Sequence, residues 1–138
     1  MKKHGIINSS IATTLSMMGH TDTITISDSG LPINQSVKRI DLAYKPSEPA
    51  FLSIVDVIKD DMVIEKITLA EEIKSENPTI YKALLQMFNN IPIEYVSHEE
   101  FKRLTTSSKA VVRTGEMTPF ANIILHSGVN FGGNNNET

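Results

Sequence analysis

The amino-acid sequence predicts an α/β fold, a three-layer α/β/α sandwich with a largely parallel central sheet. Short segments that are β-branched or alternate polar with apolar residues indicate strands, and they alternate with segments whose apolar residues share helical spacing. Such alternation favours crossover connections and parallel pairing. With 138 residues, 40% of them hydrophobic, the chain is long enough for one domain with a buried core. We place this domain at residues 1–131 and expect the polar tail, 132–138, to be disordered.

The first elements are a helix and a core strand. Asn8 or Ser9 can cap the helix, and Gly19 stands where many helices end on a C′ glycine. Residues 23–27 follow, are β-branched at four of five positions and alternate polar with apolar, which predicts a strand. A Gly-Leu-Pro turn closes the segment.

The remaining chain continues the alternation. Residues 50–58 suit either a buried strand or a helix, and the helical spacing of their apolar residues favours a helix. Two further helices begin at good caps, one at Asn77 before Pro78 and one at Ser97 with Glu100 three residues later. Strong helix formers fill 69–74, and strands are predicted at 37–42, 62–68, 91–96, 110–113 and 122–125.

The composition excludes several classes of function. A formal net charge of −3 gives no basic surface for nucleic acid or an anionic membrane. The absence of cysteine excludes disulfides, thiolate catalysis and cysteine-ligated metal sites. No run approaches the roughly 18 apolar residues of a membrane span, and polar residues 8–10 interrupt any signal-like segment. We therefore expect a cytoplasmic protein.

Polar side chains follow several of the predicted strands. Asp28 comes directly after the first strand, His98 comes two residues after the fourth, and Thr114 and Glu116 follow the fifth. Ligands of open α/β sheets bind beyond the carboxyl ends of the strands, so these side chains can converge on one site. Lys102 lies one helical turn after His98 and can face the same way.

His20 does not fit this edge of the sheet. It stands before the strand whose far end carries Asp28, and eight extended residues span roughly 25 Å at about 3.3 Å each. Within one subunit the two side chains should therefore lie at opposite ends of the strand. His20 is either structural, or it completes a site on a neighbouring subunit, and we hypothesise the second.

Each candidate also has a plainer structural explanation. His20 can complement a helix dipole, Asp28 can form an Asx turn, and His98 can merely extend a helix cap. His126 suits a packed or interface position, and His4 is terminal. Three histidines and an aspartate are potential metal ligands, but no HExxH-type spacing supports a metal site, so we expect none.

Seven short motifs occur in an order that strongly resembles the D-ribose pyranase and fucose mutarotase family. Any one of them is weak, but the ordered set is specific and extends over residues 2–131. The motifs are Gly19-His20-Thr21-Asp22, Asp28-x-Gly30-Leu31-Pro32, Arg39-Ile40-Asp41, Glu71-Glu72-Ile73-Lys74, His98-Glu99-x-Phe101-Lys102, Arg113-Thr114-Gly115-Glu116 and Pro119-x-Ala121-Asn122.

The resemblance implies a cofactor-free isomerase that interconverts the pyranose and furanose forms of D-ribose by acid/base ring opening and reclosure. It implies a cytosolic enzyme whose product feeds a ribokinase. It also implies ring-shaped homo-oligomers, decamers or octamers, with sites between subunits. The family's general acid carries over to His20. Its sugar-binding positions carry over to the residues Asp28, His98, Phe120, Ala121 and Asn122.

Two departures and one addition qualify this assignment. The family usually has Tyr where this chain has Phe120, so a ring hydroxyl is absent, and Ser29 stands where Ala is common. Lys102 is added as a sugar-binding residue from helix geometry and its motif.

The alternative function is a non-catalytic sugar-binding or regulatory module of a ribose transport system, which needs no proton donor. A small metal-dependent hydrolase is a more distant third.

Overall fold

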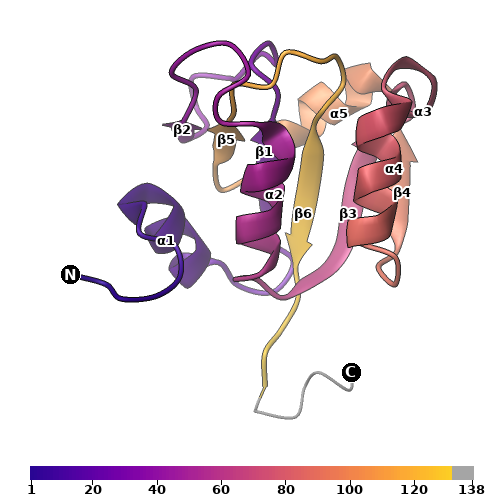
Figure 1. Cartoon of the computed structure of the whole chain (residues 1–138). Coiled ribbons are helices and arrows are strands. Elements are labelled where there is room, and N and C mark those ends of the chain that lie inside the picture. The colour runs from indigo at the N-terminus through magenta and orange to yellow at the C-terminus, as the bar shows by residue number, and fades with distance from the viewer. Residues whose placement is uncertain (132–138) are drawn as a thin grey trace.

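A computed structural model of the chain describes residues 1–131, in which helices pack on both faces of a six-stranded sheet (Figure 1). The predicted tail at 132–138 lies outside the described residues. The elements, in chain order, are α1 Ser9–Met17, β1 Thr23–Ser27, β2 Arg39–Asp41, α2 Phe51–Lys59, β3 Ile64–Ala70, α3 Ile73–Glu76, α4 Pro78–Met87, β4 Ile93–Val96, α5 His98–Thr105, β5 Val111–Arg113 and β6 Ile123–Ser127.

The sheet has the strand order β2-β5-β1-β6-β3-β4 and is largely parallel, as predicted. Strands β2, β5 and β1 are mutually parallel, as are β3 and β4, whereas β6 is antiparallel to both of its neighbours, β1 and β3. The segment 114–122, which joins β5 to β6, contains no helix. The amino end of β6 therefore lies at the edge of the sheet where the parallel strands end, and the residues just before β6 reach the predicted site.

The two faces of the sheet are covered unequally. The main core lies on the face of α1, α2 and α4, where the β1 side chains Ile24 and Ile26 pack with Phe51 and Leu84. On the other face α5 packs Phe101 over a smaller apolar cluster. Helices α2 and α4 stand in front of the sheet and α5 behind it (Figure 1). The predicted three layers are confirmed.

The capping signals correctly locate three helix starts. Asn8 Oδ1 accepts from the amide of Ile11 at 3.0 Å and opens α1. The side chains of Asn77 and Ser97 cap α4 and α5 in the same way. The ambiguous segment 50–58 is helical, as α2. The carboxylate of Glu100 pairs with Arg103 on the surface of α5.

Two local predictions are wrong. Residues 69–74 are not one helix, because β3 continues to Ala70 and only the short α3 follows. Leu69 and Ala70 are buried in the sheet, so tertiary packing overrides their helical propensity. Gly19 is not a left-handed C′ glycine. Helix α1 ends at Met17, its C-cap residue Met18 is extended, and the positive φ falls on Thr21, at 72°.

None of the helices within residues 1–131 combines the length and the apolar character needed to cross a membrane. In the same residues, no three potential metal ligands among His, Asp and Glu side chains gather into a cluster.

Candidate functional site

Four predicted residues meet at the carboxyl edge of the sheet. Asp28 follows β1, His98 begins α5 after β4, and Phe120 and Asn122 precede the antiparallel β6. Contacts join them in pairs: the Asn122 side chain hydrogen-bonds to the amide and to the carboxylate of Asp28, and the ring of Phe120 packs on His98. Ala121, between these two, is completely buried. The antiparallel direction of β6 brings its segment to this edge.

The carboxylate of Asp28 is held by its own turn. Its Oδ1 accepts from the amides of Gly30 at 3.0 Å and Leu31 at 2.9 Å, so the Asx turn is present. Its Oδ2 lies 3.4 Å from Asn122 Nδ2. Burial raises the pKa of Asp28 above its ordinary value of 3.8, and the two backbone hydrogen bonds oppose this shift. The turn thus positions Oδ2 to accept a hydrogen bond from a ligand.

His98 presents an unsatisfied ring nitrogen. Its backbone amide donates to both carboxylate oxygens of Glu72, at 3.0 and 3.2 Å, at the start of α5. Its Nδ1 is buried and has no hydrogen-bond partner within residues 1–131. A buried polar atom without a partner costs about 1–3 kcal/mol, so a ligand that bonds to it recovers that cost. His98 is therefore prepared for a polar ligand.

Phe120 has a strained backbone that shapes this side of the site. Its φ is 58°, in the left-handed region that non-glycine residues seldom adopt. The bend directs the Phe120 ring edge-on to His98, with centroids 4.9 Å apart and planes at 88°. Two residues on, Asn122 is 1% exposed, and its Oδ1 accepts from the amide of Asp28 at 2.9 Å. Strain of this kind often accompanies function.

His20 lies away from this cluster. It precedes β1, and its Nε2 is 2.8 Å from a carboxylate oxygen of Glu65, near the start of the parallel strand β3. The amide of the following residue, Thr21, donates to the carbonyl of Ser127 at the end of β6. His20 and Asp28 thus lie at opposite ends of the sheet within one chain. Both side chains of the His20–Glu65 pair are about half exposed, at 52% and 45%.

Lys102 is not brought into contact with the cluster. Its Nζ pairs with Glu99 at 2.8 Å and lowers the pKa of that carboxyl. The side chain lines a neighbouring pocket of about 200 Å³ together with Pro32 and Asn34, which follow the Asp28 turn. A direct contact of Lys102 with sugar therefore stays a prediction.

Thr114 and Glu116 reach the same edge but serve the scaffold. Thr114 Oγ1 donates to the carbonyl of Ser27 at 2.7 Å, and the Glu116 carboxylate accepts from the amide of Phe51 at the start of α2. Reasoning from the sequence missed Glu72 as the partner of His98 and Glu65 as the partner of His20. The only sequence feature that pointed to Glu72 was its place in one of the seven family motifs. No sequence feature pointed to Glu65.

Comparison with known proteins places the chain in a family. The model of the RbsD / FucU transport protein family matches residues 1–130. The D-ribose pyranase of Bacillus cytotoxicus is 56% identical over 131 residues, which cover 95% of this chain and 100% of the relative. The structure of Bacillus subtilis RbsD complexed with D-ribose superposes with a TM-score of 0.93 at 52% identity, covering 95% of this chain and 100% of that one.

A more distant relative has the same fold. The fucose mutarotase of Streptococcus pneumoniae, solved in complex with L-fucose, superposes with a TM-score of 0.81 at 26% identity, over 94% of this chain and 100% of that one. The sequence motifs, the sheet and both levels of similarity agree, and the chain belongs to the RbsD / FucU transport protein family.

Proposed function

We propose that this chain is an isomerase that interconverts the pyranose and furanose forms of D-ribose. The observation that carries the proposal is the buried Nδ1 of His98, without a partner in residues 1–131, at the edge that also holds Asp28 and Asn122. The relatives named D-ribose pyranase and the D-ribose complex of the Bacillus subtilis protein support ribose as the substrate.

Ring interconversion needs only proton transfers. A base takes the proton of the anomeric hydroxyl while an acid protonates the ring oxygen, and the opened chain recloses through the C4 or the C5 hydroxyl. No electrons pass to a cofactor. An imidazole suits this chemistry because its unperturbed pKa of about 6.5 allows it to give and take protons near neutral pH.

The side chains of the cluster match the groups of a sugar. Asp28 Oδ2 accepts hydrogen bonds from hydroxyls, and Asn122 can both donate and accept. The ring of Phe120 offers an apolar surface to a sugar face. His98 Nδ1 either orients a hydroxyl or transfers the second proton. Lys102 would contribute from the adjacent turn of α5.

His20 would complete the site from a partner subunit, as the general acid. Its half-exposed side chain at the end opposite Asp28 supports an assembly in which one end of each subunit meets the other end of the next. Such head-to-tail contacts form a ring when the rotation from one subunit to the next closes. This supports a ring-shaped homo-oligomer, a decamer or an octamer, and we place it in the cytoplasm, as the family resemblance implies.

NMR exchange between ribose ring forms tests the proposal. The wild-type chain should accelerate pyranose–furanose exchange, and His20→Ala should abolish that acceleration while retaining some ribose binding. His4→Ala is the matched control, because His4 is exposed near the terminus, and it should exchange at the wild-type rate. Ribose binding without faster exchange would instead indicate a binding module.

A further inference from the structure

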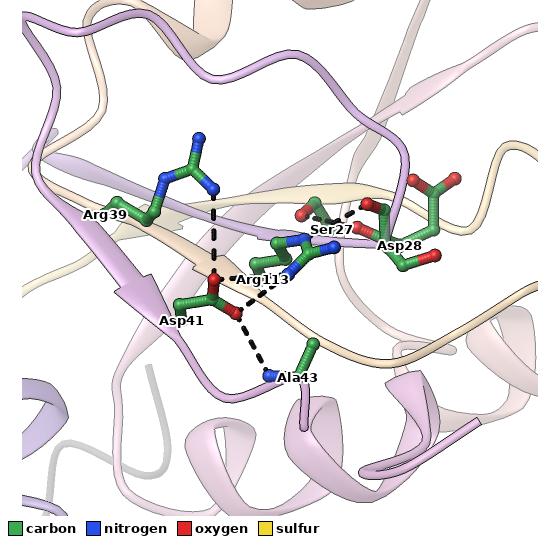
Figure 2. A network of polar contacts seen from close by, with 7 residues as sticks. Ser27, Asp28, Arg39, Asp41, Ala43 and Arg113 are labelled. Atoms are coloured by element: carbon green, nitrogen blue, oxygen red, sulfur yellow. Dashed lines mark hydrogen bonds and ion pairs between the residues drawn. The ribbon is translucent and has the colours of Figure 1, made fainter. Parts of the chain in front are cut away.

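Two motifs of the family pattern have no part in the proposed chemistry, yet they meet in the structure. Arg39-Ile40-Asp41 forms strand β2, and Arg113-Thr114-Gly115-Glu116 begins at the end of β5. The two strands pair in parallel with Asp41 opposite Arg113 (Figure 2). The Arg113 side chain lies between Asp41 and the segment of Ser27 and Asp28, as Figure 2 shows.

One guanidinium connects β2 to the residue after Asp28. Arg113 Nη1 lies 3.1 Å from both carboxylate oxygens of Asp41, and Arg113 Nε donates to the carbonyl of Ser29 at 3.1 Å. The fork of an arginine makes both contacts at once, in directions that a single lysine ammonium cannot reproduce. The carboxylate of Asp41 is itself fixed by the amide of Ala43, at 3.1 Å.

The same stretch of chain holds the residue before Asp28. The carbonyl of Ser27 accepts from the amide of Thr114 at 3.0 Å and from its hydroxyl at 2.7 Å. The amide of Ser29 donates to the carbonyl of Glu116 at 2.9 Å. The backbone on both sides of Asp28 is thus held by residues 113–116. The side-chain part of that support comes from the Thr114 hydroxyl before Asp28 and from the Arg113 guanidinium after it.

Open space beside Ser29 makes its contact with the Arg113 guanidinium important for holding the Ser29 carbonyl in place. Ser29 and Arg113 line an open pocket of about 330 Å³, together with Tyr44 and Met117. The Ser29 hydroxyl donates to Met117 Sδ at 3.3 Å on that side, and the pocket leaves room for Ser29 to shift. Loss of the guanidinium contact would therefore let the carbonyl of Ser29 turn and reorient the Asp28 carboxylate one residue away.

We propose that the Asp41–Arg113 pair is a positioning device for Asp28, which acts through the Ser29 carbonyl and touches no substrate. This inference rests on the proposed function of Asp28 in ribose binding. A misplacement of about 1 Å in a binding group can cost up to about 100-fold in rate, so a modest shift of the Asp28 turn is sufficient for a large effect.

Arg113→Lys tests the inference against Arg39→Lys. Arg39 pairs with the same carboxylate, at 3.9 Å, and in Figure 2 its guanidinium is joined to Asp41. We expect Arg113→Lys to lower kcat/KM for ribose exchange about 10-fold, mainly through KM, and Arg39→Lys to stay near wild type. Both variants should melt at similar temperatures. Equal kinetics in the two variants would overturn the inference.

The background of Asp28→Asn separates positioning from a general structural effect. If Arg113 acts through Asp28, then Arg113→Lys should change ribose affinity by less than about twofold once Asp28 has been replaced, because the two effects are coupled rather than additive. A full additional loss in that background would contradict the inference. Asp41→Asn, which keeps the guanidinium, is the second variant should Arg113→Lys fail to fold.

A readout without ribose distinguishes this inference from the proposed function. The amides of Gly30 and Leu31 donate to Asp28, so their TROSY NMR shifts report its carboxylate directly. Arg113→Lys should move these shifts and Arg39→Lys should not. If the wild type accelerates no exchange but the shifts still move, the proposed function fails and the positioning role stands. Unmoved shifts in Arg113→Lys would overturn that role.

Discussion

Asn122 and Asp28 bind each other through two contacts. The side-chain oxygen of Asn122 accepts from the backbone amide of Asp28 at 2.9 Å, while its Nδ2 lies 3.4 Å from Asp28 Oδ2. This pairing fixes which end of the buried amide faces the carboxylate. It joins the end of β1 to the start of the antiparallel β6, and it makes the site depend on the orientation of a single amide group.

Asn122→Asp should therefore damage the site more than its small change in shape suggests. It keeps the acceptor for the amide of Asp28 but places a second carboxylate beside the first, in a position only 1% exposed. We expect a loss of about 1–3 kcal/mol in stability and a similar weakening of ribose binding. Calorimetric titration and thermal melting measure both. Asn34→Asp, in an exposed turn, is the matched control, and an equal effect there would refute the explanation.

Ribose affinity should depend on pH through Asp28. Burial raises the pKa of this carboxyl above 3.8, so as the pH falls Asp28 becomes protonated earlier than an exposed aspartate and loses its acceptor strength. Affinity should fall as the pH decreases through that raised pKa. In Asp28→Asn, affinity should be weaker and nearly constant over the same range. A pH profile of the variant that still follows the wild type would contradict this role.

The raised pKa of Asp28 also predicts the sign of the stability difference between Asp28→Asn and the wild type. Because the folded state holds the proton of Asp28 more tightly than the unfolded state, the carboxyl contributes less stability as the pH rises above 3.8 through the raised pKa. Asp28→Asn should thus gain stability relative to wild type at neutral pH, and the gain should shrink toward acid pH. Melting temperatures across the pH range measure it.

His126 should make the protein lose stability on mild acidification. It lies in β6, where its Nε2 is 2.8 Å from Thr68 Oγ1. Burial, and secondarily Lys66, lowers its pKa below 6.5, whereas Glu94 and Glu65 oppose the shift. The unfolded state then binds the proton more tightly, so stability is lost as the pH falls below 6.5.

His126→Gln should flatten that loss in thermal melts between pH 7.5 and 5.5. His4→Gln, at an exposed position, should retain it. If both variants lose stability on acidification as the wild type does, His126 is not responsible.

Gly115→Ala should be strongly destabilising. A Cβ at Gly115 would lie 2.5 Å from both the amide nitrogen and the carbonyl oxygen of Glu48, and these are backbone atoms rather than the end of a flexible side chain. We expect a loss of about 1–3 kcal/mol or more in chemical denaturation. Gly19→Ala is the control, because its Cβ would meet only the side chain of Asp22 at 3.8 Å. Equal stability of the two variants would contradict the close approach at Gly115.

Much of the fold could be predicted from local signals. Periodicity located the strands, and capping residues such as Asn77 and Ser97 located helix starts, because these effects depend on neighbours in the sequence. The convergence of Asp28 and His98 followed from the rule that strand ends share an edge. The direction of β6 was not predictable, since the helix-free connection before it fixes neither its partner nor its sense.

The remaining features of the site depend on contacts between distant segments. The hydrogen bonds of Glu72 to His98 and of Arg113 to Ser29 appear only once the strands are in register. The left-handed backbone of Phe120 was not predictable either, because phenylalanine has no preference for positive φ. These are the places where tertiary structure, rather than local pattern, determines the site.

Mixing two impaired variants, one without the general acid and one with weakened ribose binding, tests the two-subunit site most directly. His20→Ala and Asp28→Asn chains would be co-expressed with different tags, and mixed oligomers purified and assayed for ribose exchange at low ribose. If each site takes His20 from one subunit and Asp28 from the next, random pairing should restore about one quarter of the sites to wild type. The account predicts that recovery. Mixed oligomers no more active than the average of the two parents would contradict it.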